Sequence, residues 1–156
     1  MFTTYNAALF GHVLGVLLFV SGIVLAGVPF EIARRRQEPS EIAVILGLAR
    51  AGVPLVGAGT LMVLGFGLWL VHLGSWGFGT GWVDGALALF VIALVLGAVG
   101  GQRPKAARVH AAQLASEHAP LDAELRNLLC DPVSRAINYA SAAAVLAILG
   151  LMVFKP

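Results

Sequence analysis

The chain is short of charged residues. Asp, Glu, Lys and Arg make up 12% of its 156 residues, against about 25% in an ordinary soluble domain. Hydrophobic residues make up 59%. Too few charged residues are present to cover the surface of a water-soluble domain. The composition therefore excludes a soluble protein and favours a membrane protein.

Cysteine is nearly absent too, and so are the short motifs of common enzymes. The single Cys130 excludes an intramolecular disulfide. The chain has no CxxC pair, no H-E-x-x-H helix, no phosphate-binding glycine loop and no G-x-S-x-G turn. The sequence therefore assigns no reaction and leaves open whether the protein is an enzyme.

Charge is missing altogether from four long stretches, Met1–Phe30, Ala51–Val83, Gly85–Gln102 and Ala136–Phe154. Each can supply the roughly 20 apolar residues that a spanning helix needs. We therefore expect an all-α, polytopic membrane protein, a bundle of four transmembrane helices that forms one domain over residues 1–156. The helices are expected at about 5–32, 42–73, 84–102 and 132–154, and the third can extend to about residue 118.

The basic residues predict the orientation. All but one of the ten fall in two loops or beside them: Arg34, Arg35, Arg36, Arg50, Arg103, Lys105, Arg108, Arg126 and Arg135. Since such loops stay in the cytoplasm, we expect both there and the N- and C-termini outside, in a bacterial inner membrane crossed several times. These side chains suit anionic lipid headgroups in the bilayer, and no nucleic-acid partner is expected.

Small and capping residues predict how the helices pack and begin. Gly11 and Gly15 have the GxxxG spacing that lets helix backbones approach closely, which leaves packing within the bundle and contact in a homo-oligomer both open. Asp131 with Pro132 predicts the start of the fourth helix. Asp84 is expected to cap the third, with a proton-exchange carboxylate as the alternative.

One ion pair is expected near the membrane surface. Arg50 lies a turn or two inside the second predicted helix, where a charge must reach the interface or find a partner. Glu31, at the inner end of the first helix, is the expected partner, and the pair would fix the relative height of the two helices. Substrate binding is the alternative role.

Two histidines lie in the outer halves of the first two helices. His12 is 19 residues before Glu31, and His72 is 22 residues after Arg50. At a rise of 1.5 Å per residue these separations are about 29 and 33 Å, so the two imidazoles are expected at nearly the same height.

The surroundings of these histidines suit a b-type haem. His12 shares a helix face with Gly15 and Gly22, and His72 shares one with Gly65 and Trp69, so the glycines would leave room for a flat ring. Neutral imidazole is a common axial ligand of haem iron. We expect His12 and His72 as metal ligands, with hydrogen bonds between helices as the alternative role.

The order of several short motifs carries a resemblance. The opening run Asn6–Gly22, the arginine-rich first loop, the run Gly67–Leu70 and the ending Leu151–Pro156 together resemble a bacterial family of predicted integral membrane proteins of unknown function. That family looks like a distant relative of the membrane domain of copper-resistance protein D and of HemJ-type protoporphyrinogen oxidases. The resemblance implies His12 as the first-helix haem ligand and Lys155 as the lysine of the Lys-Pro ending, which can attract a haem propionate. The HemJ-type enzymes also use a lysine in a later helix, which the third helix here lacks, so fold and haem are implied but no reaction.

Together these patterns predict a four-helix inner-membrane protein that binds haem b near its outer surface, for electron transfer with a membrane redox partner or for sensing. A cofactor-free scaffold or accessory subunit is the alternative. A small transporter is a third class, disfavoured because only Arg50 and Glu31 bring charge toward the lipid.

Overall fold

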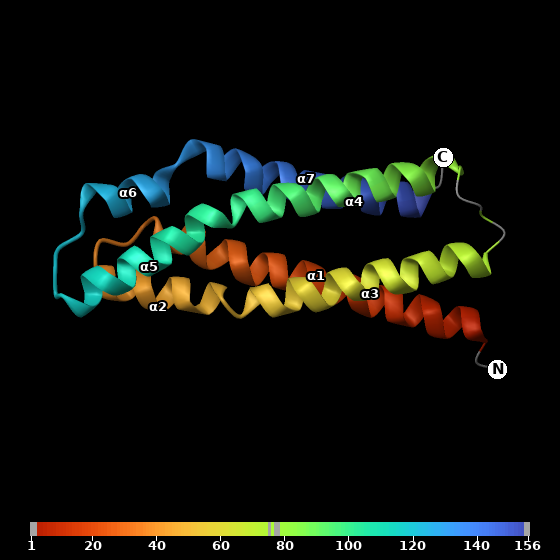
Figure 1. Ribbon diagram of the computed structural model, residues 1–156, viewed down its shortest axis with the longest axis horizontal. Coiled ribbons are helices and arrows are strands. Elements are labelled where there is room, and N and C mark those ends of the chain that lie inside the picture. The colour runs from red at the N-terminus through yellow and green to blue at the C-terminus, as the bar shows by residue number, and fades with distance from the viewer. Residues whose placement is uncertain (1–2, 75, 77–78, 155–156) are drawn as a thin grey trace. The chain divides into compact units, whose positions relative to one another are not determined.

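The described chain is made of helices. The computed structural model describes residues 3–74, 76 and 79–154, and these residues form seven α-helices (Figure 1). In chain order they are α1 (Thr4–Ala33), α2 (Pro39–Ala49), α3 (Gly52–Leu73), α4 (Gly81–Gly100), α5 (Gln102–Ser116), α6 (Ala123–Cys130) and α7 (Pro132–Phe154). These residues contain no strand, which confirms the all-α prediction.

Four helical segments are long and apolar enough to cross a membrane, Thr4–Ala33, Pro39–Leu73, Gly81–Ser116 and Ala123–Phe154. By length and composition they confirm the predicted number of spans. The first begins and ends within one residue of the predicted 5–32, and α7 covers the predicted 132–154.

The second span is broken where one continuous helix was predicted. α2 ends at Ala49 and α3 begins at Gly52, and the amides of Arg50 and Ala51 bond to carbonyls only three residues back. Pro54 explains the break, because proline has no N–H to give the carbonyl of Arg50 and its ring crowds that carbonyl. Arg50 therefore lies between two helices and not inside one, and its side chain is exposed.

The third span is also interrupted shortly before a proline. α4 ends at Gly100 and α5 starts at Gln102, so Gly101, three residues before Pro104, separates them. The ring of Pro104 crowds the carbonyl of Gly100, four residues back. α5 then continues to Ser116, which confirms that the third helix extends past residue 102. It ends in a Schellman turn, in which the amide of Ala119 bonds to the carbonyl of Leu114 and His118 takes a positive φ of 52°.

Aspartates begin the last two helices. The carboxylate of Asp122 accepts from the amide of Leu125 at 2.8 Å, and that of Asp131 from the amide of Ser134 at 2.9 Å. The predicted start at Asp131 is thus confirmed. The prediction that Asp84 caps the third helix is wrong: α4 begins at Gly81, and Asp84 lies within its first turn, where it accepts from the amide of Gly79 at 3.4 Å.

The chain divides into two compact units. The first unit consists of Met1–Ile32 and Ile45–Gly77, and it contains α3 and nearly all of α1. The second unit consists of Ala33–Val44 and Phe78–Pro156, and it contains α4 to α7. The single membrane domain expected over the whole chain stays a prediction.

In the first unit, α1 and α3 lie side by side and antiparallel, with glycines at their contacts (Figure 1). A Cβ added to Gly15 would be 2.7 Å from Met62, and one on Gly59 would be 2.4 Å from the backbone nitrogen of Phe19. A Cβ on Gly52 would be 2.5 Å from the carbonyl oxygen of Gly22. We call this contact, from Gly11 to Ala26 on α1 and from Gly52 to Gly67 on α3, the α1–α3 seam. Its backbones touch, so the small residues of this seam serve packing within the chain.

In the second unit, α4 and α7 pack antiparallel along most of their length. The buried residues of α4 are spaced three or four residues apart or at sums of these, as in a coiled coil: Val83, Ala86, Phe90, Ala93 and Gly100. A Cβ on Gly100 would be 2.8 Å from Ile137, and one on Gly85 would be 3.4 Å from Leu151. The shorter α5 and α6 pack on each other in the same unit.

Candidate functional site

His12 is the only histidine that is buried in the described chain, with 8% of its surface exposed. Its Nδ1 lies 3.1 Å from the backbone oxygen of Val63, on α3. Because a carbonyl oxygen only accepts, Nδ1 must carry the hydrogen and donate it. The neutral ring then keeps a lone pair on Nε2, the nitrogen that is able to bind a metal.

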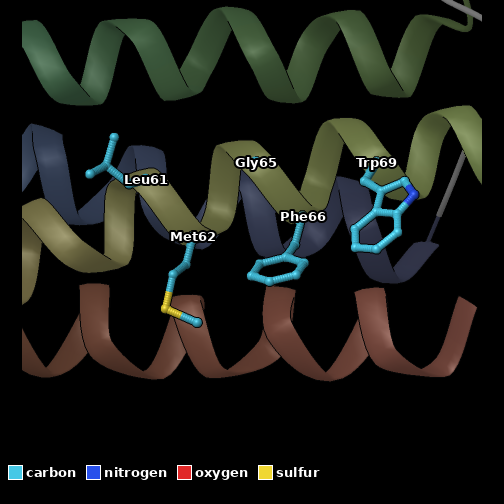
Figure 2. Close-up of a pocket in the computed structure, with 5 residues that line it drawn as sticks. All are labelled: Leu61, Met62, Gly65, Phe66 and Trp69. Atoms are coloured by element: carbon cyan, nitrogen blue, oxygen red, sulfur yellow. The ribbon is translucent and has the colours of Figure 1, made fainter. Parts of the chain in front are cut away.

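Gly67 makes room for this imidazole. A Cβ at residue 67 would be 3.2 Å from both Cε1 and Nδ1 of His12. The side chains of Met62 and Phe66, on the same helix, also point toward α1 (Figure 2), and the Phe66 ring covers Gly11. The ring of His12 is therefore held by packing and by one hydrogen bond to the neighbouring helix.

The structure does not bring His72 to the partners of His12. His72 is exposed, in the last turn of α3, five residues beyond Gly67, which is about 7.5 Å along the helix axis. The prediction that the two imidazoles lie at equal heights is wrong, because it assumed that Glu31 and Arg50 lie at the same height. In the antiparallel packing of α1 and α3, Ala26 lies against Gly52, so Arg50 is level with a residue that precedes Glu31.

The glycines of α1 do not leave a slot for a flat ring. The space beside Gly11 is filled by Phe66, that beside Gly15 by Met62 and that beside Gly22 by Val56. This overturns the expectation that these glycines make room for a cofactor, because the close approach of α3 uses that space.

An open apolar groove lies instead on α3 itself. It measures about 250 Å³ and is lined by Leu61, Met62, Gly65, Phe66 and Trp69 (Figure 2). The rings of Phe66 and Trp69 stack, with centroids 6.1 Å apart and planes 24° from parallel. A Cβ on Gly65 would meet no described atom within 4 Å, so this glycine forms an open floor.

A second group of polar side chains, which the sequence did not single out, lies between α5 and α6. His110 Nε2 is 2.7 Å from Asp122 Oδ2, and Glu124 lies close to both. The hydrogen bond from the Leu125 amide, and then that from His110, lower the pKa of the Asp122 carboxyl, so this group is an anion at neutral pH. The signal in the sequence was a histidine on one helix of a short hairpin with an aspartate capping the next.

Comparison with known families agrees with this helical, apolar architecture. Residues 7–156 match the family described as "Predicted integral membrane protein (DUF2269)". The chain belongs to this family. No curated protein and no solved structure matches it. As a member of this family, the chain is an integral membrane protein and lies in a lipid bilayer.

Two further predictions concern residues at the edges of the membrane-spanning segments. The ion pair between Arg50 and Glu31 stays a prediction, and so does its alternative, a role of Arg50 in substrate binding. Lys155, expected to attract a haem propionate, lies outside the described residues. Of the expected ligands, His12 alone is thus placed in a defined, buried contact.

Proposed function

We propose that this member of the family is a bacterial inner-membrane protein that binds b-type haem through Nε2 of His12, for electron transfer or sensing. The observation that supports this is the hydrogen bond from Nδ1 to the Val63 carbonyl. Metal-binding histidines commonly donate their other ring N–H to a backbone carbonyl, which fixes the tautomer and the orientation of the ring. The distant likeness to copper-resistance protein D and to the HemJ-type oxidases, which the sequence motifs imply, is part of this proposal and would assign the same first-helix position.

The residues around His12 fit an axial ligand better than they fit an enclosed slot. The imidazole is buried and held in one orientation by a hydrogen bond, and in its neutral form Nε2 could ligate haem iron. The α1–α3 seam is filled, so the residues present offer no slot for a flat ring between these two helices. His72 and Lys155 remain proposed contributors, His72 as the second ligand and Lys155 at a propionate.

Bound haem would supply one-electron chemistry, and the side chains of the protein would determine the environment of the haem. Apolar side chains and a hydrogen-bonded axial imidazole are the means by which proteins adjust the potential of a haem. Electron transfer would also require a redox partner in the membrane, which belongs to this proposal.

The full chain, purified in detergent from haem-supplied cells, tests the proposal by its absorption spectrum. We expect a Soret band that shifts on reduction. It should nearly vanish in His12→Asn, whose amide can still donate to Val63 but does not ligate iron. The His72→Ala variant tests the proposed second ligand: the band should weaken or shift in that variant, and an unchanged band would remove His72 from the proposal.

The alternative is a cofactor-free scaffold or accessory subunit, and the filled seam favours it. In that case the bond between His12 and Val63 only holds two helices together. A colourless, fully helical preparation from haem-supplied cells would refute the haem proposal and leave this alternative.

A further inference from the structure

The hairpin of α5 and α6 gathers three metal-binding side chains. They are His110 on α5, Asp122 at the start of α6 and Glu124 in the first turn of α6. The possible ligand atoms of these three all lie within 4.8 Å of one another. They come from two packed helices and the end of the turn between them, so a bound ion would join α5 to α6.

The carboxylate of Asp122 is already held in position. Its Oδ1 accepts from the Leu125 amide at 2.8 Å, and its Oδ2 faces His110 Nε2 at 2.7 Å. Ligating carboxylates in proteins are themselves commonly hydrogen-bonded, and such partners orient them toward the metal. The guanidinium of Arg126, on the same helix, donates to Gln37 at 2.8 Å.

We infer that His110, Asp122 and Glu124 bind one divalent transition-metal ion of the Zn²⁺ type, which clips α5 to α6. A neutral imidazole with two carboxylates balances a charge of +2. An imidazole ligand suits Zn²⁺, whereas Mg²⁺ and Ca²⁺ prefer sites made of oxygen alone. This site is independent of any haem at His12.

The geometry needs only small side-chain rotations. Zn–N and Zn–O bonds of about 2.0–2.1 Å in a tetrahedral site put ligand atoms about 3.3 Å apart. On metal binding the imidazole of His110 would keep its hydrogen on Nδ1 and use the lone pair of Nε2, so two bonds to the metal would replace the hydrogen bond to Asp122. The two atoms would separate from 2.7 Å to about 3.3 Å. Glu124 would close in from within 4.8 Å. Three protein ligands leave the fourth position for water.

A hydrogen-bonded clasp without metal is the competing explanation. It accounts for His110 and Asp122, but it gives no role to Glu124, whose side chain is exposed. Glu124 therefore separates the two explanations, since Glu124→Gln keeps the size of the side chain and leaves the His110–Asp122 bond in place.

The experiment uses the full chain in detergent, stripped of metal and titrated with Zn²⁺ in competition with a chromophoric zinc indicator. We expect one equivalent of Zn²⁺ to bind, with affinity lowered by at least about tenfold in both His110→Ala and Glu124→Gln. The control is His118→Asn, which removes a neighbouring histidine outside the cluster and tolerates the positive φ there. It should bind as the unaltered protein does, and Mg²⁺ should not compete.

Hydrogen exchange gives a second measurement, independent of binding affinity. Zn²⁺ should slow amide exchange in α5 and α6 of the unaltered protein and should have no such effect in Glu124→Gln. The proposal is overturned if the unaltered protein binds Zn²⁺ no more tightly than His110→Ala, or if Glu124→Gln keeps full affinity and full protection. The first result would leave the hydrogen-bonded clasp, and the second would show that Zn²⁺ binds without Glu124.

Discussion

At the scale of single residues, two glycines of α3 that are two positions apart have opposite surroundings. Gly59 faces the backbone of Phe19, where a Cβ would approach to 2.4 Å, while a Cβ on Gly57 would meet no described atom within 4 Å. Backbone atoms of a packed helix cannot turn aside as the end of a side chain can. The same substitution at these two positions should therefore have different effects.

We predict that Gly59→Ala lowers the free energy of unfolding by about 1–3 kcal/mol, because the added methyl group forces α1 and α3 apart. Gly57→Ala should leave it unchanged or raise it by up to about 1 kcal/mol, since alanine is the better helix former. Unfolding by SDS in mixed micelles, followed by circular dichroism, measures both. Equal losses in the two variants would mean that the α1–α3 seam does not form as described.

The histidines show how far residue types lead. The sequence singled out His12 as a buried, ligand-competent group, since ionisable side chains in spanning helices are rare and have a purpose. Its partner could not be read from the sequence. A backbone carbonyl such as that of Val63 has no sequence signature, and the facing residue depends on how one helix is shifted along the other.

At the scale of helices, the ends were easier to predict than the breaks. The long apolar runs gave α1 and α7 nearly complete, because uncharged stretches bounded by charges or caps mark the ends. The breaks at Arg50 and Gly101 were missed. Proline is tolerated in the first turn of a helix, so Pro54 and Pro104 by themselves do not say whether a helix is interrupted or merely bent.

The start of α7 depends on one carboxylate. Asp131 accepts from the amide of Ser134 at 2.9 Å, and the same oxygen lies 3.6 Å from Arg103. We predict that Asp131→Ala lowers the free energy of unfolding by about 1 kcal/mol, because a first-turn amide loses its acceptor.

The matched variant Asp131→Asn keeps the capping oxygen and loses only the charge. It should stay within a few tenths of a kcal/mol of the unaltered protein, since the Arg103 side chain is about half exposed and its nitrogen is 3.6 Å away, so the ion pair contributes little. The same micelle unfolding titration compares the two. If Asp131→Asn loses as much as Asp131→Ala, the ion pair with Arg103 and not the cap is what stabilises this end of α7.

At the scale of the whole molecule, the four spans and the family membership make this an integral membrane protein. Its predicted orientation rests on charge, because arginine-bearing loops tend to be retained on the cytoplasmic side. We predict that reporters fused after Arg35 and after Arg108 report the cytoplasm, and that a reporter at the C-terminus reports the opposite compartment. Fusions that put Arg35 and Arg108 on different sides would contradict the predicted topology.

The sequence by itself determined the class of the molecule, its four spans, both ends of α1 and α7 and the end of α3. These follow from local composition: apolar length, charge at the boundaries and capping residues. Only the tertiary structure decided the register of α1 against α3, the carbonyl that His12 contacts and the meeting of His110 with Asp122 and Glu124. These contacts depend on how far one helix is shifted along its neighbour. That shift is set by how the surfaces of two helices fit together, with glycines of one against side chains and backbone of the other, and no single stretch of sequence contains both surfaces.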